Sequence, residues 1–329
     1  MREGGQPWAT RVAVVYLYQG GEVEEERKSG ITHVRISPVV TKLGNGALSG
    51  CINLVEVQFD EGELQYIGQG AFLNCKALRE VIMPSSVTVL GIWAFRNCIS
   101  LSKVQLNEGL EVIGDDAFYD CRALQQVTIP SSVTQLGLGA FYNCSNLAAV
   151  HFNKGLEVIG DYAFHGCTAL QQATIPSGVT ELGDSAFCQC MSKAQFNEGL
   201  EVIGGGAFWG CKALQEVTIP SSVKELRANA FSGCSNLTEV HFKEGWSLQF
   251  IGDTAFRNCT ALHHVAVPLS VTKLGQSAFW GCTNLTEVIL LGGDMLLNQR
   301  FIDRGLFSGE GALDKKIFQR GGWLPHLYG

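Results

Sequence analysis

Apolar positions recur along the chain in one fixed order, and this order repeats about every 23 residues. A clear copy runs over residues 124–144 with the pattern L-x-x-V-x-I-P-S-S-V-x-x-L-G-x-x-A-F-x-x-C. Eleven copies fill residues 32–290, and each ends in a cysteine that follows a phenylalanine, or once Leu48, by three residues. A fixed period in this range predicts a solenoid in which every copy forms one turn. The closing cysteines are Cys51, Cys75, Cys98, Cys121, Cys144, Cys167, Cys190, Cys211, Cys234, Cys259 and Cys282.

The first third of each copy alternates apolar and polar residues, which predicts a short β-strand. In the copy above, Leu124, Val127 and Ile129 face inward, whereas Gln126 and Thr128 face the opposite side. Equal strands from successive turns then stack in parallel. The pattern therefore predicts a curved, right-handed solenoid with one concave parallel β-sheet.

The rest of each copy predicts a corner and a return segment. A glycine precedes A-F-x-x-C in every copy but that of Arg227, and we expect this glycine to adopt a positive φ. The A-F-x-x-C motif predicts one helical or 3₁₀ turn, with Asp115, Asp161 and their equivalents as N-caps and the phenylalanines buried as a spine. The glycines are Gly44, Gly68, Gly91, Gly114, Gly137, Gly160, Gly183, Gly204, Gly252 and Gly275.

Two kinds of copy alternate, which gives a second period of about 46 residues. Proline-type copies carry a proline after the strand, whereas glycine-type copies carry a glycine in the same turn. We expect two kinds of turn to alternate along the stack. The prolines are Pro38, Pro84, Pro130, Pro176, Pro220 and Pro268, and the glycines are Gly62, Gly109, Gly155, Gly199 and Gly245.

The segments outside the repeats predict caps, because a bare solenoid end exposes core side chains and unpaired strand edges. Residues 12–18 alternate as a strand with Tyr16 and Tyr18 facing inward, and the acidic stretch GEVEEERK follows as a predicted loop. Apolar residues at helical spacing in 295–307 and 312–320 predict a C-terminal cap. The expected parts are a capping strand and acidic loop (1–31), the solenoid (32–290), and a helical cap and tail (291–329).

Composition and charge exclude several partner classes. The net charge is −7 and no Lys/Arg stripe follows any column, so we expect neither nucleic acid nor an anionic membrane surface as a partner. The longest apolar run, residues 12–18, is too short to span a bilayer or to form a signal-peptide core. The sequence as given thus predicts a cytoplasmic or other intracellular location, with the cell surface as the alternative.

The cysteine column predicts free, buried thiols. Stacked turns lie ~4.8 Å apart with parallel Cβ directions, whereas a disulfide requires converging Cβ atoms about 3.8 Å apart. Cys188 stands outside the column, in a copy shortened by two residues. It is either a reactive thiol or a substitution at an outward position.

No pattern for a metal, a cofactor or catalysis emerges. His241 and His264 lie diagonally on adjacent predicted strands, but no third ligand has a matching phase. The glycine run 204–206 lacks the Lys-Ser/Thr of a phosphate loop. No serine, histidine and acidic residue occupy repeat positions that would bring them together on one face of the solenoid. We therefore expect no catalytic residue and no enzymatic activity.

The repeat columns resemble the BspA-like class of leucine-rich repeats, which occurs in bacterial surface proteins and in protist families that include algae. The stretches LQQVTIPSSVTQLGLGAFYNC and LAAVHFNKGLEVIGDYAFHGC carry the resemblance, which covers roughly 260 of the 329 residues. It implies an α/β-type leucine-rich repeat solenoid that binds a protein or a glycan. No catalytic motif comes with it.

Two surfaces are candidate binding sites. The first, the strand face, is the outward side of the central strands, which is polar and free of carboxylates and can therefore hydrogen-bond a protein or a glycan. A merely solvated sheet face is the alternative. The strand face comprises Lys103, Gln105, Gln126, Thr128, Ala149, His151, Gln172, Thr174, Lys193 and Gln195.

The second candidate, the aromatic row, lies one residue after the phenylalanine spine. Surface aromatics often mark an interface, and packing between turns is the alternative. Trp246, in the two-residue insertion GWS, is expected to project from the solenoid edge. The aromatic row comprises Tyr119, Tyr142, His165, Cys188 and Trp209, with Trp280 further along.

Taken together, the sequence favours a non-enzymatic scaffold that binds a protein, and possibly a glycan, through the strand face. One alternative is a surface or secreted adhesin that binds host or glycan ligands. The other is a structural spacer or subunit of a larger assembly. Free thiols in the native protein favour the intracellular scaffold over the adhesin.

Overall fold

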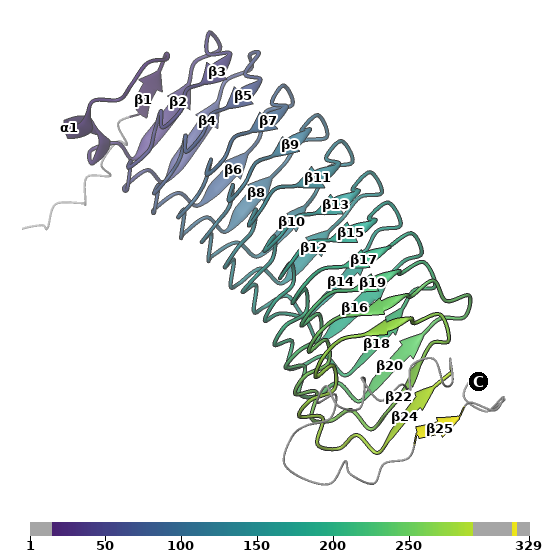
Figure 1. Cartoon of the computed structure of the whole chain (residues 1–329). Coiled ribbons are helices and arrows are strands. Elements are labelled where there is room, and N and C mark those ends of the chain that lie inside the picture. The colour runs from purple at the N-terminus through teal and green to yellow at the C-terminus, as the bar shows by residue number, and fades with distance from the viewer. Residues whose placement is uncertain (1–14, 292–317, 321–329) are drawn as a thin grey trace, which may run out of the picture.

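The repeats form one continuous stack of parallel-stranded turns. The computed structural model of the chain describes residues 15–291 and 318–320. About eleven turns follow one another in a curved stack (Figure 1). The described residues contain a single short helix, α1 (Glu25–Lys28). The predicted solenoid is confirmed.

Apart from β25, the first set of strands lies where the apolar alternation predicts it, with one strand in each turn. In the strand over residues 126–128 the two polar side chains are exposed and Val127 is buried, as predicted. The strands are β1 (Val15–Tyr18), β2 (His33–Ile36), β4 (Glu56–Phe59), β6 (Glu80–Ile82), β8 (Lys103–Gln105), β10 (Gln126–Thr128), β12 (Ala149–His151), β14 (Gln172–Ile175), β16 (Lys193–Phe196), β18 (Glu216–Ile219), β20 (Glu239–Phe242), β22 (His264–Val267), β24 (Glu287–Leu290) and β25 (Phe318–Arg320).

A second parallel sheet, which the sequence analysis missed, runs along the stack beside the first. It has eleven strands of two residues each, too short for an alternation to stand out in the sequence. The strands are β3 (Lys42–Leu43), β5 (Tyr66–Ile67), β7 (Val89–Leu90), β9 (Val112–Ile113), β11 (Gln135–Leu136), β13 (Val158–Ile159), β15 (Glu181–Leu182), β17 (Val202–Ile203), β19 (Glu225–Leu226), β21 (Phe250–Ile251) and β23 (Lys273–Leu274).

The predicted phenylalanine spine forms the core of the return side. Its rings are fully buried and stack within 8° of parallel, with neighbouring centroids 4.8 to 5.7 Å apart. The widest spacing, 5.7 Å, separates Phe187 from Phe208 across the shortened copy. The spine comprises Phe72, Phe95, Phe118, Phe141, Phe164, Phe187, Phe208, Phe231, Phe256 and Phe279.

The A-F-x-x-C motif is not helical, which corrects the prediction of a helical or 3₁₀ turn. Ala140 N donates to Gly137 O and Cys144 N to Phe141 O, each at 3.3 Å, so the segment consists of successive four-residue turns. Phe141 N points along the stack instead and donates to Ala163 O of the next turn at 2.8 Å. Alternate N–H groups therefore join neighbouring turns, which a helix would prevent by using them internally.

The aspartates predicted as N-caps join turns as well. The Asp115 carboxylate accepts from Leu138 N at 2.8 Å, and the Asp161 carboxylate accepts from Asp184 N at 2.7 Å. Each bond reaches the following turn. These side chains cap no helix, and they satisfy corner N–H groups of the neighbouring copy.

Nine of the ten corner glycines lie in close backbone contact with the preceding turn, and none has a positive φ, contrary to the prediction. A Cβ on Gly137 would lie 2.7 Å from Asp115 N and 2.8 Å from the carbonyl carbon of Gly114, because the turns stack backbone to backbone here. The left-handed residues lie two positions later, as at Gly139 (φ 58°) and Tyr162 (φ 57°).

Four of the six column prolines mark breaks in the first sheet. In the glycine-type turns of Asp60 and Lys243 the N–H after the strand donates to the preceding turn, as Lys243 N does to Ile219 O at 3.0 Å, whereas at Asn153 and Asn197 the side-chain amide donates there instead. Proline has no N–H to donate at this position. The sheet breaks before β10, β14, β18 and β22, the strands that run into Pro130, Pro176, Pro220 and Pro268, whereas β6, which runs into Pro84, still pairs with β4 at one position. The pairs β10–β12, β14–β16, β18–β20 and β22–β24 remain hydrogen-bonded.

The ends of the solenoid depart from the predicted caps. β1 pairs with β2 and buries Tyr18, as expected, but α1 replaces part of the predicted acidic loop. Residues 318–320, predicted as helix, form β25, which pairs with the otherwise open edge of β24. Edge pairing satisfies N–H and C=O groups that a helix would leave open. The predicted helix over 295–307 and residues 12–14 of the N-terminal strand lie outside the described residues.

All twelve cysteines are free and buried. In the typical turn the thiol donates to the phenylalanine carbonyl of the preceding turn, as Cys144 Sγ does to Phe118 O at 3.2 Å. Cys188 is only 1% exposed, so it does not lie at an outward position. Burial raises the pKa of the Cys188 thiol to about 12, which disfavours a reactive thiolate.

These thiols predict a loss of stability at alkaline pH. Burial raises the pKa of Cys167 to about 12 and that of Cys51 to about 11, whereas unfolded thiols ionise near about 8.5. The native state therefore holds protons that the unfolded state releases, and this stabilisation is complete below about pH 8.5 and is lost as the pH rises toward 12.

We expect the melting temperature to fall steadily between about pH 8.5 and 11, and we expect Cys167→Ser to make the decline shallower. Circular dichroism melts across this range measure both effects. Equal melting temperatures for the wild-type chain at about pH 8 and pH 10.5 would contradict the buried-thiol account.

Candidate binding surface

The strand face lies as the sequence predicts, and its side chains are neighbours on adjacent strands. Gln126 and Thr128 of β10 lie opposite Ala149 and His151 of β12. One break further along, Gln172 and Thr174 of β14 lie opposite Lys193 and Gln195 of β16. All predicted strand-face residues are exposed except Ala149, which is half-buried.

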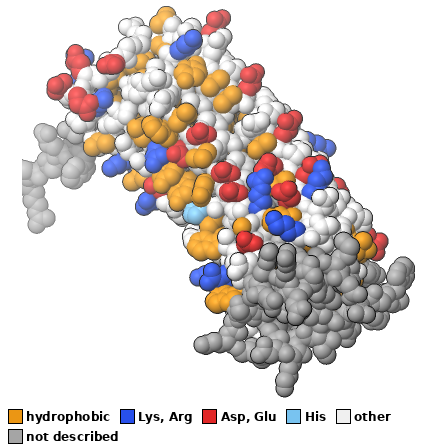
Figure 2. Space-filling view, in the orientation of Figure 1, with side chains coloured by type: hydrophobic (Ala, Val, Ile, Leu, Met, Phe, Trp, Pro, Cys, Tyr) orange, Lys and Arg blue, Asp and Glu red, His pale blue; other side chains and the backbone are white. Residues whose placement is uncertain are grey.

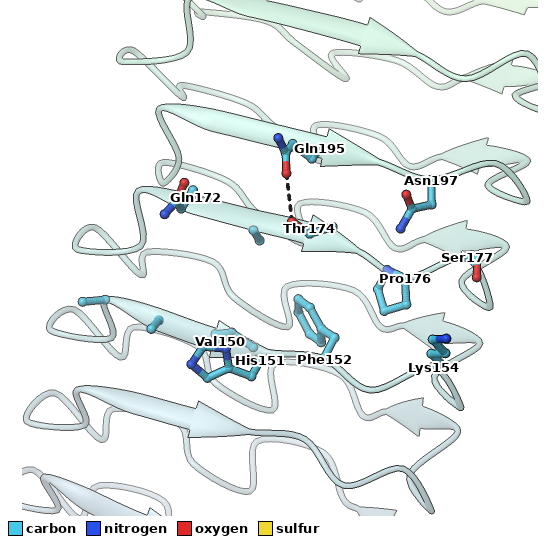
Figure 3. Close-up of a pocket in the computed structure, with 13 residues that line it drawn as sticks. Val150, His151, Phe152, Lys154, Gln172, Thr174, Pro176, Ser177, Gln195 and Asn197 are labelled. Atoms are coloured by element: carbon cyan, nitrogen blue, oxygen red, sulfur yellow. Dashed lines mark hydrogen bonds between the residues drawn. The ribbon is translucent and has the colours of Figure 1, made fainter.

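A groove opens in the strand face where the sheet breaks between β12 and β14. Its cavity volume is about 490 Å³. Figure 3 shows Phe152 and Pro176 on the two sides of the break, with His151, Gln172 and Gln195 toward one end of the groove and Lys154 and Asn197 toward the other. Five predicted strand-face residues line this groove: Ala149, His151, Gln172, Thr174 and Gln195.

Several groove residues escaped the sequence analysis, namely Phe152, Lys154, Pro176, Ser177 and Asn197. They lie in the turns that follow the strands. The alternation of apolar and polar residues within the strands therefore did not select them. The proline column contained a usable signal, because a proline at the end of a strand predicts a missing hydrogen bond to the neighbouring strand.

The polar groups of the groove are only partly used within the protein. Thr174 Oγ1 donates to Gln195 Oε1 at 3.0 Å, and Asn197 Nδ2 donates to Ile175 O at 2.9 Å. His151, Lys154 and Gln172 make no side-chain hydrogen bond or ion pair with any described residue. No carboxylate lines the groove. Donors and one positive charge are thus available to a ligand.

Toward its two ends the same face carries charges that are already paired. Lys103, one of the predicted contact residues, forms an ion pair with Glu80. Arg35 pairs with Asp60 at 2.6 Å, and the His241 ring lies 2.8 Å from Glu239. A second cavity of about 650 Å³, between β4 and β6, is rimmed by acids: Glu56, Asp60, Glu61 and Glu80. The centre, which has lysines but no carboxylate, and the acid-rich ends are therefore chemically distinct.

The His241 and His264 side chains do not assemble a metal centre. His241 faces Glu239, and within residues 15–291 and 318–320 no three His, Cys, Asp or Glu side chains are grouped to hold a metal ion.

The aromatic row is largely packed against itself. The Tyr119 and Tyr142 rings stack with centroids 4.6 Å apart, and Tyr142 and His165 stack at 4.7 Å. The Arg96 guanidinium covers Tyr119 at 3.9 Å. Burial lowers the pKa of His165. Trp209 alone has a largely open ring, with 44% of the residue exposed.

Trp209 also borders a hollow at the shortened copy. Because this copy lacks two residues between Cys190 and β16, a cavity of about 830 Å³ opens beside Met191, Trp209 and Lys212. The ladder between β14 and β16 nevertheless keeps four paired positions. The deletion therefore changes the loop and leaves the strand pairing intact.

Charge is mixed over the face visible in Figure 2, where acidic and basic side chains alternate with hydrophobic ones and no stripe of one sign forms. A search of the described residues for a helix long and apolar enough to cross a membrane finds none.

The fold and the repeat columns define a leucine-rich repeat solenoid. The family model for the BspA type leucine rich repeat region matches residues 26–148, 65–193 and 188–309. The chain therefore belongs to the BspA-type leucine-rich repeat family, as its columns predict.

Solved structures of leucine-rich repeat proteins are similar to this chain. A leucine-rich repeat protein from Bacteroides ovatus is 25% identical, with 94% of this chain and 92% of that chain covered and a TM-score of 0.64. A leucine rich cell surface protein from Faecalibacterium prausnitzii is 25% identical, with coverage of 79% and 73% and a TM-score of 0.47. No curated protein matches significantly.

Proposed function

We propose that this chain is a non-catalytic scaffold that binds a protein through the strand face, with the groove between β12 and β14 at the centre of the contact. The observation that carries the proposal is the set of unpartnered polar side chains in this groove: His151, Lys154 and Gln172. Several charged side chains toward both ends of the face, such as Arg35, Lys103 and Glu239, are instead paired within the protein.

The chemistry of the groove suits a protein surface. Interfaces combine apolar contact with about one hydrogen bond per 100–200 Å² of buried area. Here Phe152 and Pro176 supply apolar surface between amide, hydroxyl and imidazole groups. The free thiols favour a reducing compartment, because cysteines rarely form disulfides there. Membership of a repeat family whose members present extended faces supports the same function.

Replacing His151 and Gln172 by glutamate tests the proposal. Two carboxylates should repel a partner that fits the present surface, which carries Lys154 and no carboxylate, so we expect at least a tenfold loss of the captured partner in pull-downs from the native source. Both side chains are exposed strand positions, so the free energy of unfolding should change by less than about 0.5 kcal/mol.

The matched control is Gln135→Glu with Thr180→Glu, two exposed positions associated with the second sheet. This variant should retain the partner. A partner lost equally from both variants, or kept by both, would count against the strand face. Capture of no partner at all from the native source would favour the spacer.

A further inference from the structure

One backbone acceptor in the groove lacks the donor that the repeat architecture would otherwise provide. In the glycine-type turns of Asp60 and Lys243 the N–H after the strand bonds the carbonyl one turn back, as Lys243 N does to Ile219 O at 3.0 Å. The equivalent donor for Phe152 O would be residue 176, which is proline. No donor in the described ranges of the chain bonds Phe152 O.

The protein itself contains an occupied version of this position. Phe242 is the equivalent of Phe152 two glycine-type turns later, and residue 268, opposite it, is again proline. There the indole Nε1 of Trp246 donates to Phe242 O at 3.3 Å. Trp246 is half-buried, so it does not project freely from the edge as the sequence analysis predicted. The two-residue insertion brings this ring to the acceptor.

The groove between β12 and β14 has the components for a similar ring but no residue of its own to supply one. The turn after Phe152 lacks the insertion and runs Asn153, Lys154, Gly155. The Phe152 ring is fixed edge-on against Phe164, with centroids 5.6 Å apart. Pro176 faces it across the break, and a volume of about 490 Å³ is within the range of small-ligand sites.

The charges around the groove specify what should flank the ring. Lys154 is exposed and unpaired within the described residues, and no carboxylate lines the cavity. An acidic neighbour on the ligand would therefore be attracted, and a basic neighbour would find no counter-charge.

From these features we propose that the groove between β12 and β14 binds a tryptophan side chain of a partner protein, presented next to an acidic residue. The indole N–H donates to Phe152 O, as Trp246 does to Phe242 O within the chain. The ring fills the break between Phe152 and Pro176, and the acidic residue lies by Lys154. This inference rests on the proposed function and specifies the partner.

A synthetic peptide tests it, with acetyl-Gly-Asp-Trp-Asp-Gly-amide as the probe and isothermal titration calorimetry of the full chain as the measurement. We expect saturable binding to one site. The same peptide with 1-methyltryptophan, which lacks the indole N–H, should bind roughly tenfold more weakly, the loss expected for one unmade hydrogen bond.

Pro176→Ala is the matched protein variant. Alanine restores an N–H opposite Phe152 O, so the strands should pair, the acceptor should be consumed, and affinity for the tryptophan peptide should fall at least tenfold. Pro220→Ala makes the same change at the next break and should leave this affinity unchanged. Melting temperatures of both variants establish that they are folded.

Absence of saturable binding of the tryptophan peptide to the wild-type chain would overturn the inference. Equal affinity of the methylated peptide, or undiminished binding by folded Pro176→Ala, would overturn it as well. If a captured partner still depends on His151 and Gln172 in those cases, the protein-binding function stands and only the tryptophan site fails.

Discussion

Phe141→Ala is expected to destabilise the chain by about 3–5 kcal/mol, the range for truncating a fully buried phenylalanine. The Phe141 ring stacks between Phe118 at 5.2 Å and Phe164 at 5.4 Å, with no exposed surface. Its removal leaves a cavity that the flanking rings cannot fill, because each is also held by its own neighbour. Chemical denaturation followed by circular dichroism measures the change.

Phe141→Leu is the graded control and should cost less, because it retains most of the buried volume. Gln135→Ala, an exposed position near the same turn, should have almost no effect. A loss below about 1 kcal/mol for Phe141→Ala would contradict the stacked spine as a principal source of stability.

Gly137→Ala is expected to cost about 3 kcal/mol, the upper part of the usual range for overpacking. The added methyl group would meet Asp115 N at 2.7 Å and the Gly114 carbonyl carbon at 2.8 Å. These are backbone atoms of the preceding turn, which can move only if the stack opens. Denaturation curves of the variant measure the loss.

Gly44→Ala separates close packing from backbone conformation. Gly44 occupies the same column in the first turn, where a Cβ would meet nothing within 4 Å. We therefore expect this substitution to be close to neutral. Equal destabilisation by both substitutions would indicate a conformational requirement for glycine, as the sequence analysis first predicted, and would contradict the packing explanation.

The sequence predicts the solenoid, its period and its inward columns because burial dominates those positions. Val127, Phe141 and Cys144 are each fixed by the need to fill the core of one turn, and that need repeats with the period. Such side-chain constraints are visible as columns in the sequence.

Hydrogen bonds between turns are less visible, because most use backbone groups that every residue carries. No side-chain pattern in the sequence marks the two-residue strands of the second sheet or the bond from the Phe141 N–H to the next turn. Gly137 was assigned to the wrong cause because a glycine column fits either a positive φ or a close approach, and only the neighbouring backbone distinguishes them.

The candidate site was half predictable for the same reason. His151 and Gln172 follow from strand alternation, whereas the groove between them depends on the break before β14. That break originates at Pro176, whose missing N–H was present in the sequence as a proline but not yet placed opposite Phe152. Trp246 was likewise assigned to the edge because its bond to Phe242 O depends on how the inserted turn folds.

The most direct test of the central claim is photo-crosslinking in the native source, with a photoreactive amino acid placed at Gln172 or, as a control, at Gln135. We predict a crosslinked protein partner at Gln172, in the groove, and none at Gln135 on the second sheet. A partner that crosslinks from Gln135 and not from Gln172 would contradict binding through the strand face.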